Sequence, residues 1–442
     1  MQNWLYAKLT LGGSKMKKTL ISLAIASVTL GAPVSAELVY PSLSYRTGPF
    51  AVGGIPFADG YADYFTLINE RDGGIGGEMT KVLECETAYN TEKGVECYEA
   101  TKDSGSLLYQ PLSTGITYQL IPKAEADGIP ILSSGYGRTS AKNGKVFRHT
   151  FNFPVNYWDG ASIGINHFKD QAGGSLNGKK VTLLHFNGAY GKEPIRTLQE
   201  LSKMEGFEFN TIPIDYPGQE QKSQWLQIRR ERPDYILFWG WGVMNQVAVQ
   251  EASNIRFPME NFMGIWWSGA EQDVLPAGDG ANGYKSLQFQ GVGSDYPLFA
   301  DINKYVVDAG KAAGDGSNVG SVIYNRGLYA AFLAHQITLD AQEMNGTSSV
   351  TPAMMRDAME QFTLTAADYE AAGLGGFGPE IKVSCENHGG QGTAAITQWD
   401  ASAQKWSLIT DYMPSDYDLI NRLVMEDSTQ YAAENNITPN CG

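Results

Sequence analysis

The sequence predicts an α/β protein built from two doubly wound units. Two observations support this: strand and helix patterns alternate along the chain, and the alternation restarts near residue 180. Alternation of this kind is typical of parallel sheets with crossover helices. A chain of 442 residues is also too long for one compact core. We therefore expect two lobes with a cleft between them.

The first unit follows a strand–helix–strand order. Tyr61, Phe65 and Ile68 recur at helical spacing and predict one of its helices. The glycine-rich run at 73–77 lacks the strand-then-helix context of a nucleotide site, and we interpret it as a turn. The expected elements are strands at 38–40, 79–85, 107–109 and 129–132, and helices at 58–70 and 118–127.

The second unit opens with the apolar run KVTLLHF at 180–186, which predicts a buried strand. A hairpin is expected at 393–399 and 405–410, and the last residues resemble a polar tail. The other expected strands are 207–214, 234–239, 262–267 and 283–290; the expected helices are 191–205, 219–232, 243–254, about 298–313, 320–343 and 352–361.

The N-terminal region resembles a secretory signal. A short basic region, Met16-Lys17-Lys18, precedes a mostly apolar stretch at 19–31, and small residues at 34–36 suit a signal peptidase. We expect a signal peptide at 1–36, cleaved after Ala36, with residues 1–15 as an upstream extension. A transmembrane anchor is the alternative, but the apolar stretch is short for a bilayer, which needs about 20 apolar residues.

The four cysteines predict two disulfide bonds, because an even count is typical of exported proteins. Sequence alone permits three pairings. We favour Cys85–Cys97, which closes a short turn-rich loop, and Cys385–Cys441, which would tie down the tail. A zinc site is the alternative, but CxxC spacing is absent and the five histidines are scattered, so no metal is expected.

Composition and motifs argue against several functions. A formal net charge of −15 disfavours nucleic acid, whose phosphates need a basic surface. The sequence contains no GxSxG, GxxxxGK[ST] or HExxH motif. His185 lies within a predicted strand and suits the core, and His388 lies in a turn-like segment without a mechanism. We expect neither an enzyme nor a cofactor; an exported hydrolase that turns over model esters is the rival interpretation.

Aromatic residues next to glycine follow several predicted strands. Ligands of open parallel sheets bind outside the carboxyl ends of the strands. Aromatic walls supply apolar area, glycine permits close backbone approach, and arginine can hold a carboxylate. Each aromatic residue alone could simply pack, but their joint position favours a ligand site. The candidate ligand-binding residues are Tyr45, Arg46, Ser113, Thr114, Ser134, Gly135, Tyr136, Arg138 and Thr139 in the first unit, and Tyr190, Trp239, Trp241, Trp266 and Trp267 in the second.

Four segments in order carry a family resemblance: "SLSYRTGPFAVGGIPFADGYADYFTLINERDGGIGG", "ADGIPILSSG", "LLHFNGAYGKE" and "RPDYILFWGWG". With these four segments in this order, the chain resembles the periplasmic substrate-binding proteins of ABC transporters, in the branched-chain amino acid class. The resemblance implies a type I periplasmic binding protein fold with two doubly wound lobes and a hinge, a monomer in the periplasm, and partnership with permease and ATPase subunits. It also implies an N-lobe disulfide, matching Cys85–Cys97.

The resemblance further implies three crossovers between the lobes, near 151–157, 283–290 and 377–383. The N-terminal lobe would comprise 37–155 plus 291–377, and the C-terminal lobe 156–290 plus 378–442.

The resemblance carries the family's amino acid site over only in part. Ser113 and Thr114 match a hydroxyl contact to the ligand carboxylate, and residues 134–139 match a second one. Tyr190, and Trp239 or Trp241, match aromatic residues that close over the ligand.

The departure follows the strand at 262–267, where the family has an acidic residue that pairs with the ligand ammonium. The chain reads GIWWS at 264–268 instead, and Glu271 lies further along.

A buried ammonium without a partner costs several kcal/mol. We therefore expect a small aromatic or bulky apolar carboxylate, or a related neutral solute, with Arg46 or Arg138 anchoring its acid group. The alternatives are a binding protein for a branched-chain or other hydrophobic amino acid, and a ligand sensor for a membrane receptor.

Overall fold

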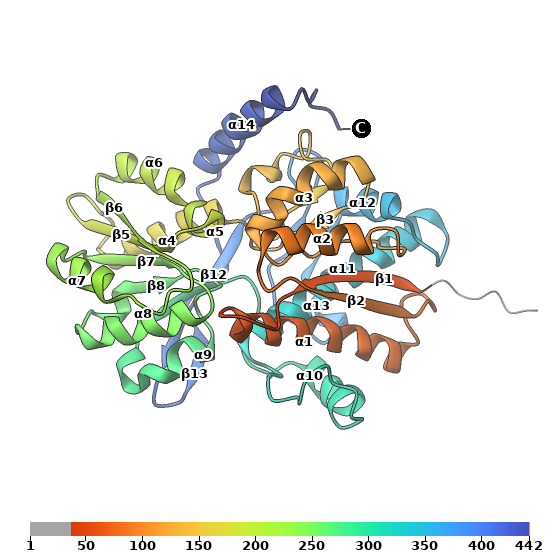
Figure 1. Ribbon diagram of the computed structural model, residues 1–442, viewed down its shortest axis with the longest axis horizontal. Helices are drawn as coiled ribbons and strands as arrows, with labels where there is room; N and C mark the ends of the chain where they lie inside the picture. Colours follow the sequence, from red (N-terminus) through yellow and green to blue (C-terminus); the bar gives the residue numbers. More distant parts are fainter. Residues whose placement is uncertain (1–36, 442) are drawn as a thin grey trace, which may run out of the picture. The chain divides into compact units, whose positions relative to one another are not determined.

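The computed structural model describes residues 37–441, so the expected signal peptide lies outside the described residues. The described residues belong to one compact unit. Within this unit the strands form two separate groups, which define a first lobe and a second lobe (Figure 1).

The first lobe has a small parallel sheet. β1 (Leu38–Ser44) pairs with β2 (Thr80–Glu86) over seven residues, and single bridges connect β1 to Gln110 and Tyr109 to β3. β1 is fully buried, as expected of a central strand in such a sheet. The remaining strands are β3 (Ile131–Leu132), β4 (Thr150–Phe151), β10 (Thr363–Leu364) and β11 (Ile381–Lys382).

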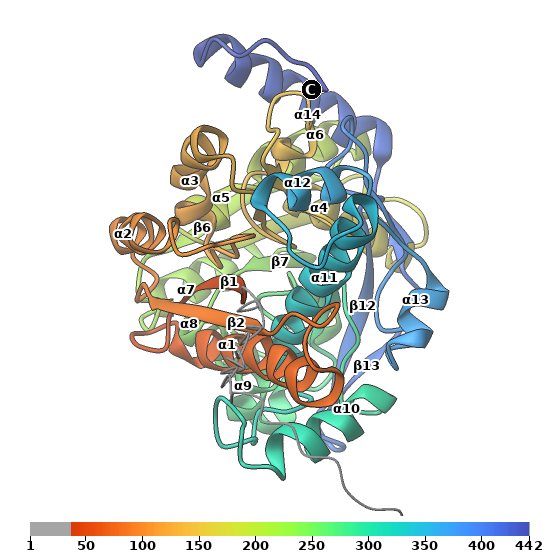
Figure 2. The ribbon, with the colours of Figure 1, turned by 90° about the vertical axis from the view of Figure 1, so that its right-hand side faces the viewer.

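Two long helices of the first lobe pack directly against each other, α1 (Ala51–Leu67) and α11 (Val322–Asn345) (Figure 2). Paired glycines permit this approach. A Cβ on Gly60 would lie 2.1 Å from the Tyr324 carbonyl oxygen, and one on Gly327 would lie 2.0 Å from that of Phe57. The other helices of this lobe are α2 (Thr91–Thr101), α3 (Thr114–Asp127), α10 (Pro297–Ile302), α12 (Pro352–Glu360) and α13 (Ala366–Ala371).

The second lobe is organised around one large sheet with strand order β13-β12-β9-β8-β7-β5-β6. The strands from β6 to β9 are parallel, whereas β12 is antiparallel to β9 and β13. The strands are β5 (Lys180–Phe186), β6 (Glu208–Ile214), β7 (Tyr235–Trp239), β8 (Phe262–Gly264), β9 (Lys285–Gln288), β12 (Thr393–Asp400), β13 (Lys405–Leu408) and β14 (Met413–Pro414), and the helices are α4 (Tyr157–Gln171), α5 (Ala189–Lys192), α6 (Ile195–Glu205), α7 (Lys222–Glu231), α8 (Val243–Asn254) and α9 (Glu271–Val274).

The chain crosses between the two lobes three times. It enters the second lobe between β4 and α4, returns between β9 and α10, and enters again between β11 and β12. The predicted α/β alternation and the hairpin of β12 and β13 are confirmed. Several helices differ from expectation: α2, α4, α9 and α13 were not predicted, and α1 begins at Ala51 rather than at 58. Helix α3 begins four residues earlier than expected, where the Ser113 side chain accepts from the Ile116 amide.

The expected polar tail is wrong, because residues Tyr417–Glu434 form an amphipathic helix, α14. Asp416 caps it by accepting from the Leu419 amide at 3.1 Å. Leu419, Ile420 and Leu423 are buried, so the polar residues that suggested a tail form its exposed face.

α14 contacts both lobes. Its Arg422 pairs with Glu200 of α6, whereas the Tyr431 ring lies 4.7 Å from that of Phe147 in the first lobe. The expected lobe boundaries assigned all of 378–442 to the second lobe, but the last part of α14 packs on the first.

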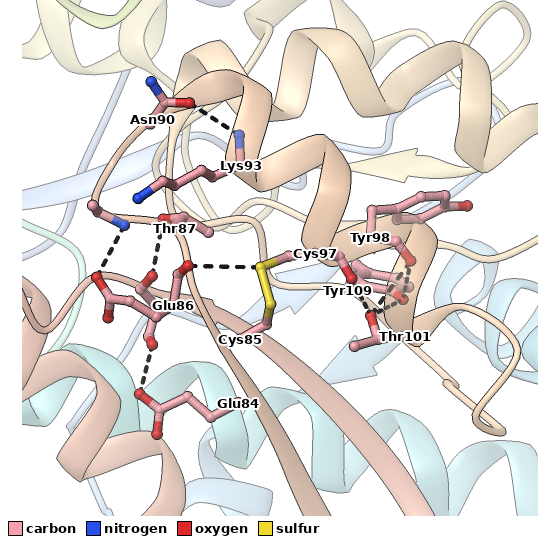
Figure 3. The surroundings of a disulfide bond; sticks show 12 residues. Glu84, Cys85, Glu86, Thr87, Asn90, Lys93, Cys97, Tyr98, Thr101 and Tyr109 are labelled. Carbon is pink, nitrogen blue, oxygen red and sulfur yellow. Dashed lines mark hydrogen bonds between the residues drawn. A yellow bond between two sulfur atoms is a disulfide. The ribbon is translucent and has the colours of Figure 1, made fainter.

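Both favoured disulfides are present. Cys85 and Cys97 connect β2 to α2 in the first lobe (Figure 3). Cys385 and Cys441 connect the segment before β12 to the chain end, across a sequence separation of 56. None of the helices among residues 37–441 is long and apolar enough to cross a membrane.

Candidate functional site

A small cavity lies where loops of both lobes meet, and the space between its lining atoms is about 230 Å³ with open solvent included. Most of the loops around it follow the carboxyl ends of strands, as the rule for open parallel sheets predicts. Tyr45 follows β1, Tyr190 follows β5 and Trp241 follows β7. The lining residues are Tyr45, Tyr89, Leu112, Ser113, Thr114 and Tyr136 from the first lobe, and Tyr157, Tyr190, Trp241 and Trp267 from the second.

Hydrogen bonds hold several of the lining rings in place. The Trp241 indole Nε1 donates to the Tyr45 hydroxyl at 3.0 Å, which connects the lobes across the cavity. The Tyr190 hydroxyl donates to the Gly240 carbonyl at 3.0 Å. The Tyr136 hydroxyl accepts from the Leu112 amide at 3.0 Å. These rings are therefore oriented before any ligand arrives.

Burial raises the pKa of all the lining tyrosines above the usual value of 10.0. Their hydroxyls therefore stay protonated near neutral pH and act as hydrogen-bond donors. The Tyr45 hydroxyl accepts from Trp241, and that of Tyr157 accepts from Thr114 at 3.5 Å. Among the described residues neither of these two hydroxyls has an acceptor for its own proton, so both can donate to a ligand.

The first turn of α3 borders the cavity, since Ser113 caps this 14-residue helix and Thr114 begins it. A helix N-terminus favours negative charge through its unpaired amides and its dipole. This end of the cavity therefore suits a carboxylate or a carbonyl oxygen.

No charged residue is found among the described residues that line the cavity. In the sequence, Glu271 is the acid that follows the GIWWS segment and could pair with a ligand ammonium. In the structure its carboxylate instead accepts from the Val322 amide at 3.1 Å. Burial raises the pKa of the Glu271 carboxyl. The cavity thus offers hydroxyl donors but no carboxylate to pair with an ammonium group.

Several predicted residues lie beside the cavity, next to Trp267, which lines it. The Nε1 atoms of Trp266 and Trp267 both donate to the Gly135 carbonyl, at 2.6 and 2.9 Å. Trp266 also stacks on Tyr157, with ring centroids 5.9 Å apart. Trp239, Ser134 and Thr139 are buried without lining the cavity.

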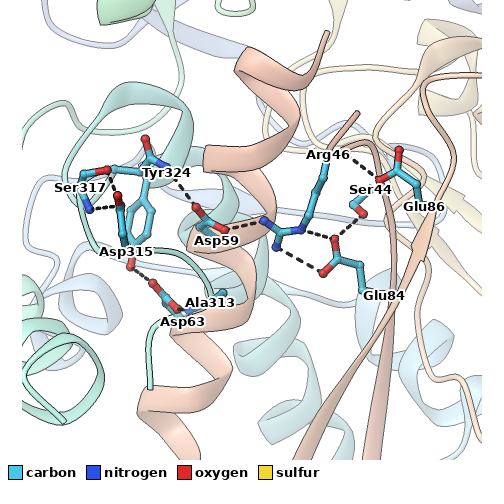
Figure 4. A network of polar contacts seen from close by, with 11 residues as sticks. Ser44, Arg46, Asp59, Asp63, Glu84, Glu86, Ala313, Asp315, Ser317 and Tyr324 are labelled. Carbon is cyan, nitrogen blue, oxygen red and sulfur yellow. Dashed lines mark hydrogen bonds and ion pairs between the residues drawn. The ribbon is translucent and has the colours of Figure 1, made fainter. Parts of the chain in front are cut away.

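Arg46 and Arg138 do not line the cavity, which corrects the expectation that one of them anchors an acid group. Arg46 binds Asp59 at 2.7 Å and Glu84 at 2.6 Å (Figure 4). Arg138 binds Asp427 of α14 at 2.6 Å. Both guanidinium groups are engaged by carboxylates that sequence spacing could not reveal.

Sequence reasoning missed three lining residues, Tyr89, Leu112 and Tyr157. Tyr89 and Leu112 have positive φ values of 58° and 48°, which no local sequence pattern predicted. Tyr157 begins α4 directly after Asn156, whose side chain accepts from the amides of the first turn. That capping residue is the one signal that could have located Tyr157. Among residues 37–441 no group of three or more His, Cys, Asp or Glu is arranged to hold a metal ion.

Comparison with known proteins identifies the family. Residues 41–405 match the family model described as periplasmic binding protein. A structure from the Pseudomonas fluorescens group, described as an ABC transporter permease, is 36% identical with a TM-score of 0.84, covering 92% of this chain and 99% of that one. A comparison with curated proteins returned no match.

Two further structures share the fold at low identity. A branched-chain amino acid ABC transporter from Thermus thermophilus with bound valine is 17% identical, with a TM-score of 0.72 and coverage of 88% of this chain and 98% of that one. A solute-binding protein from R. palustris in complex with benzoate is 15% identical, with a TM-score of 0.65 and coverage of 86% and 98%. The chain thus belongs to the periplasmic binding protein family, as a non-enzymatic substrate-binding component of ABC transporters with the type I fold.

Proposed function

We propose that the protein binds a small aromatic or bulky apolar carboxylate, or a related neutral solute, between its lobes, and delivers it to the permease and ATPase subunits of an importer. The observation that carries the proposal is the lining of the cavity. Five tyrosines and two tryptophans surround it, and no carboxylate of the described residues does.

The apolar part of the ligand is supported by these rings. Aromatic side chains supply large contact area, and edge-to-face pairs between them are favourable. Trp241 and Trp267 form such a pair, with centroids 5.2 Å apart and planes at 78°. A flat or branched apolar body fits against walls of this kind.

The acid group is supported by the donors at one side of the cavity. The hydroxyls of Tyr45 and Tyr157 and the first turn of α3 present donors without a competing carboxylate. An ammonium would instead be buried without a charged partner, at a cost of several kcal/mol. This favours an acid without an α-ammonium over an amino acid.

The size of the ligand is limited by the cavity. The space between its lining atoms is about 230 Å³ with open solvent included, and only about 10 Å³ of it can hold the centre of a water molecule, so little free space remains between the loops of the two lobes. A compact acid with one ring or one branched chain is the expected size. Binding would stabilise the arrangement in which loops of both lobes meet, and that form would dock on the permease.

A thermal-shift screen tests the proposal. Aromatic acids, short fatty acids, their amides, and amino acids are each added in excess, because bound ligand stabilises by RT ln(1 + [L]/Kd). We expect the largest rise in Tm with aromatic or branched acids. A rise only with leucine, isoleucine or valine would contradict the proposal.

A further inference from the structure

Arg326 of α11 is a buried cation that contacts no carboxylate of residues 37–441. Its side chain is 1% exposed, and its bonds go to neutral oxygens. Nε donates to Gln290 Oε1 at 3.1 Å, Nη2 donates to Gln288 Oε1 at 2.5 Å, and Nη1 donates to the Trp266 carbonyl. A charge removed from water and left without a counter-charge is costly, so its presence calls for an explanation.

The guanidinium group lies directly behind a wall of the ligand cavity. Its central carbon is 4.7 Å from the centroid of the Trp267 ring and 5.0 Å from that of Phe289. Trp267 also lines the cavity. One aromatic ring therefore contacts both the buried cation and the ligand space.

The positive charge of Arg326 acts on side chains that line the cavity. Burial lowers its pKa to about 9, so it remains protonated at neutral pH, and its charge interacts with the phenols of Tyr190 and Tyr157. Two acids, Asp273 and Glu271, also act on it through space. Burial raises the pKa of both, to about 7 for Asp273. They therefore cancel the positive field only in part.

Building on the proposed function, we propose that Arg326 is a positioning residue that makes the cavity selective for anions. Held behind Trp267, its charge stabilises the carboxylate of a bound ligand without touching it. The hydroxyl donors of Tyr45 and Tyr157 make the contact, and Arg326 supplies the positive potential that these neutral groups lack.

Arg326 also has a structural role, since it connects α11 of the first lobe to the Trp266 carbonyl of the second. Loss of affinity alone would therefore not distinguish the two roles. The ratio between binding of an acid and binding of its uncharged amide does distinguish them, because a purely structural defect weakens both equally.

The probes are matched pairs: benzoate and benzamide, phenylacetate and phenylacetamide, 3-methylbutanoate and 3-methylbutanamide. Affinities are measured by calorimetry at neutral pH for the wild type, Arg326→Gln and Arg326→Lys. Gln290→Glu is a third variant, since it places a carboxylate beside Nε and neutralises Arg326 while keeping it in place. Arg71→Gln controls for the loss of one positive charge, because Arg71 pairs with Asp72 and Asp301 on the surface.

We expect Arg326→Gln and Gln290→Glu to weaken binding of the acid by about tenfold or more, as loss of one nearby charge at low effective dielectric implies. Binding of the amides should change by less than about threefold. Arg326→Lys should retain most of the preference for acids, and Arg71→Gln should retain all of it.

Equal losses for acid and amide in Gln290→Glu would overturn the role of Arg326 while leaving the proposed function intact. The same holds for an unchanged acid-to-amide ratio in Arg326→Gln. If the wild type binds the amides but none of the acids, the role of Arg326 fails while the proposed function stands for a neutral solute. If it binds neither acids nor amides, both proposals fail.

Discussion

The Trp267 indole Nε1 donates to the Gly135 carbonyl oxygen at 2.9 Å, and so bonds the second lobe to the first beside the cavity. Trp266 donates to the same oxygen at 2.6 Å. One carbonyl of the loop after β3 thus receives both indoles of the loop after β8. Because Trp267 lines the cavity, the bond between the lobes and the wall around the ligand share a residue.

Replacing Gly135 with Ala should separate these loops. Gly135 has a φ of +74°, and a Cβ there would lie 2.4 Å from Phe289 Cε1 and 2.9 Å from Trp266 Nε1. We expect Gly135→Ala to weaken binding of the best acid by about tenfold or more, since contacts between the lobes must shift.

Gly128→Ala is the matched control for Gly135→Ala. Gly128 has a similar φ of +69°, but a Cβ there meets nothing within 4 Å. It should therefore lower Tm by the strain of a left-handed residue and leave affinity unchanged. Equal affinities in the two variants, measured by calorimetry, would show that the bonds to Gly135 do not support the site.

The bond between Trp241 and Tyr45 should contribute to affinity. Trp241→Phe keeps an aromatic wall but removes the indole donor to the Tyr45 hydroxyl. We expect binding of the acid to weaken about fivefold, in line with one neutral hydrogen bond. Trp406 is a matched control, because it is buried and its Nε1 has no partner among the described residues. A loss of affinity in Trp406→Phe as large as in Trp241→Phe would contradict this role for the bond.

Much of the site could be predicted because strand ends are visible in a sequence. Tyr45, Tyr190 and Trp241 follow apolar runs that form β1, β5 and β7, and all three line the cavity. The roles of the arginines could not be predicted. Arg138 pairs with Asp427, 289 residues away, and only the folded chain brings them together.

Helix α14 was missed for a related reason. Its few buried residues contact parts of both lobes that are distant from it in sequence. The remaining residues are mostly polar, so the sequence pattern resembles a tail.

Stability should fall in acid because of buried His335. Burial lowers its pKa from 6.5 to about 4, and its Nδ1 lies 2.9 Å from the Tyr64 hydroxyl. As pH falls below about 6.5, the unfolded chain binds the proton first. The contribution of His335 is therefore complete above pH 6.5 and is lost as pH falls toward 4.

His335→Gln should reduce the difference in unfolding free energy between pH 7.5 and pH 4.5 by up to about 3 kcal/mol. Chemical denaturation at both pH values measures it. An unchanged difference would mean that His335 is protonated without cost in the folded state.

The two disulfides should contribute unequally to stability. Cys385–Cys441 spans a sequence separation of 56, and Cys85–Cys97 spans 12. Loop closure then predicts about 4 kcal/mol for the first and about 3 kcal/mol for the second. Double Cys→Ser variants of each pair are compared by urea unfolding.

Loss of Cys385–Cys441 should also speed amide exchange in the last turns of α14, which pack on the first lobe through Tyr431. Unchanged exchange there, or a larger loss of stability from the short loop, would contradict this interpretation.

The most direct test of the central claim compares acids that differ only by an α-ammonium group. Calorimetry is performed with 4-methylpentanoate against leucine, 3-methylbutanoate against valine, and 3-phenylpropanoate against phenylalanine. The cavity has hydroxyl donors but no carboxylate among the described residues that line it, so the acid of at least one pair should bind at least about tenfold more tightly than its amino acid. Tighter binding of leucine, valine or phenylalanine than of the matching acid would contradict the claim.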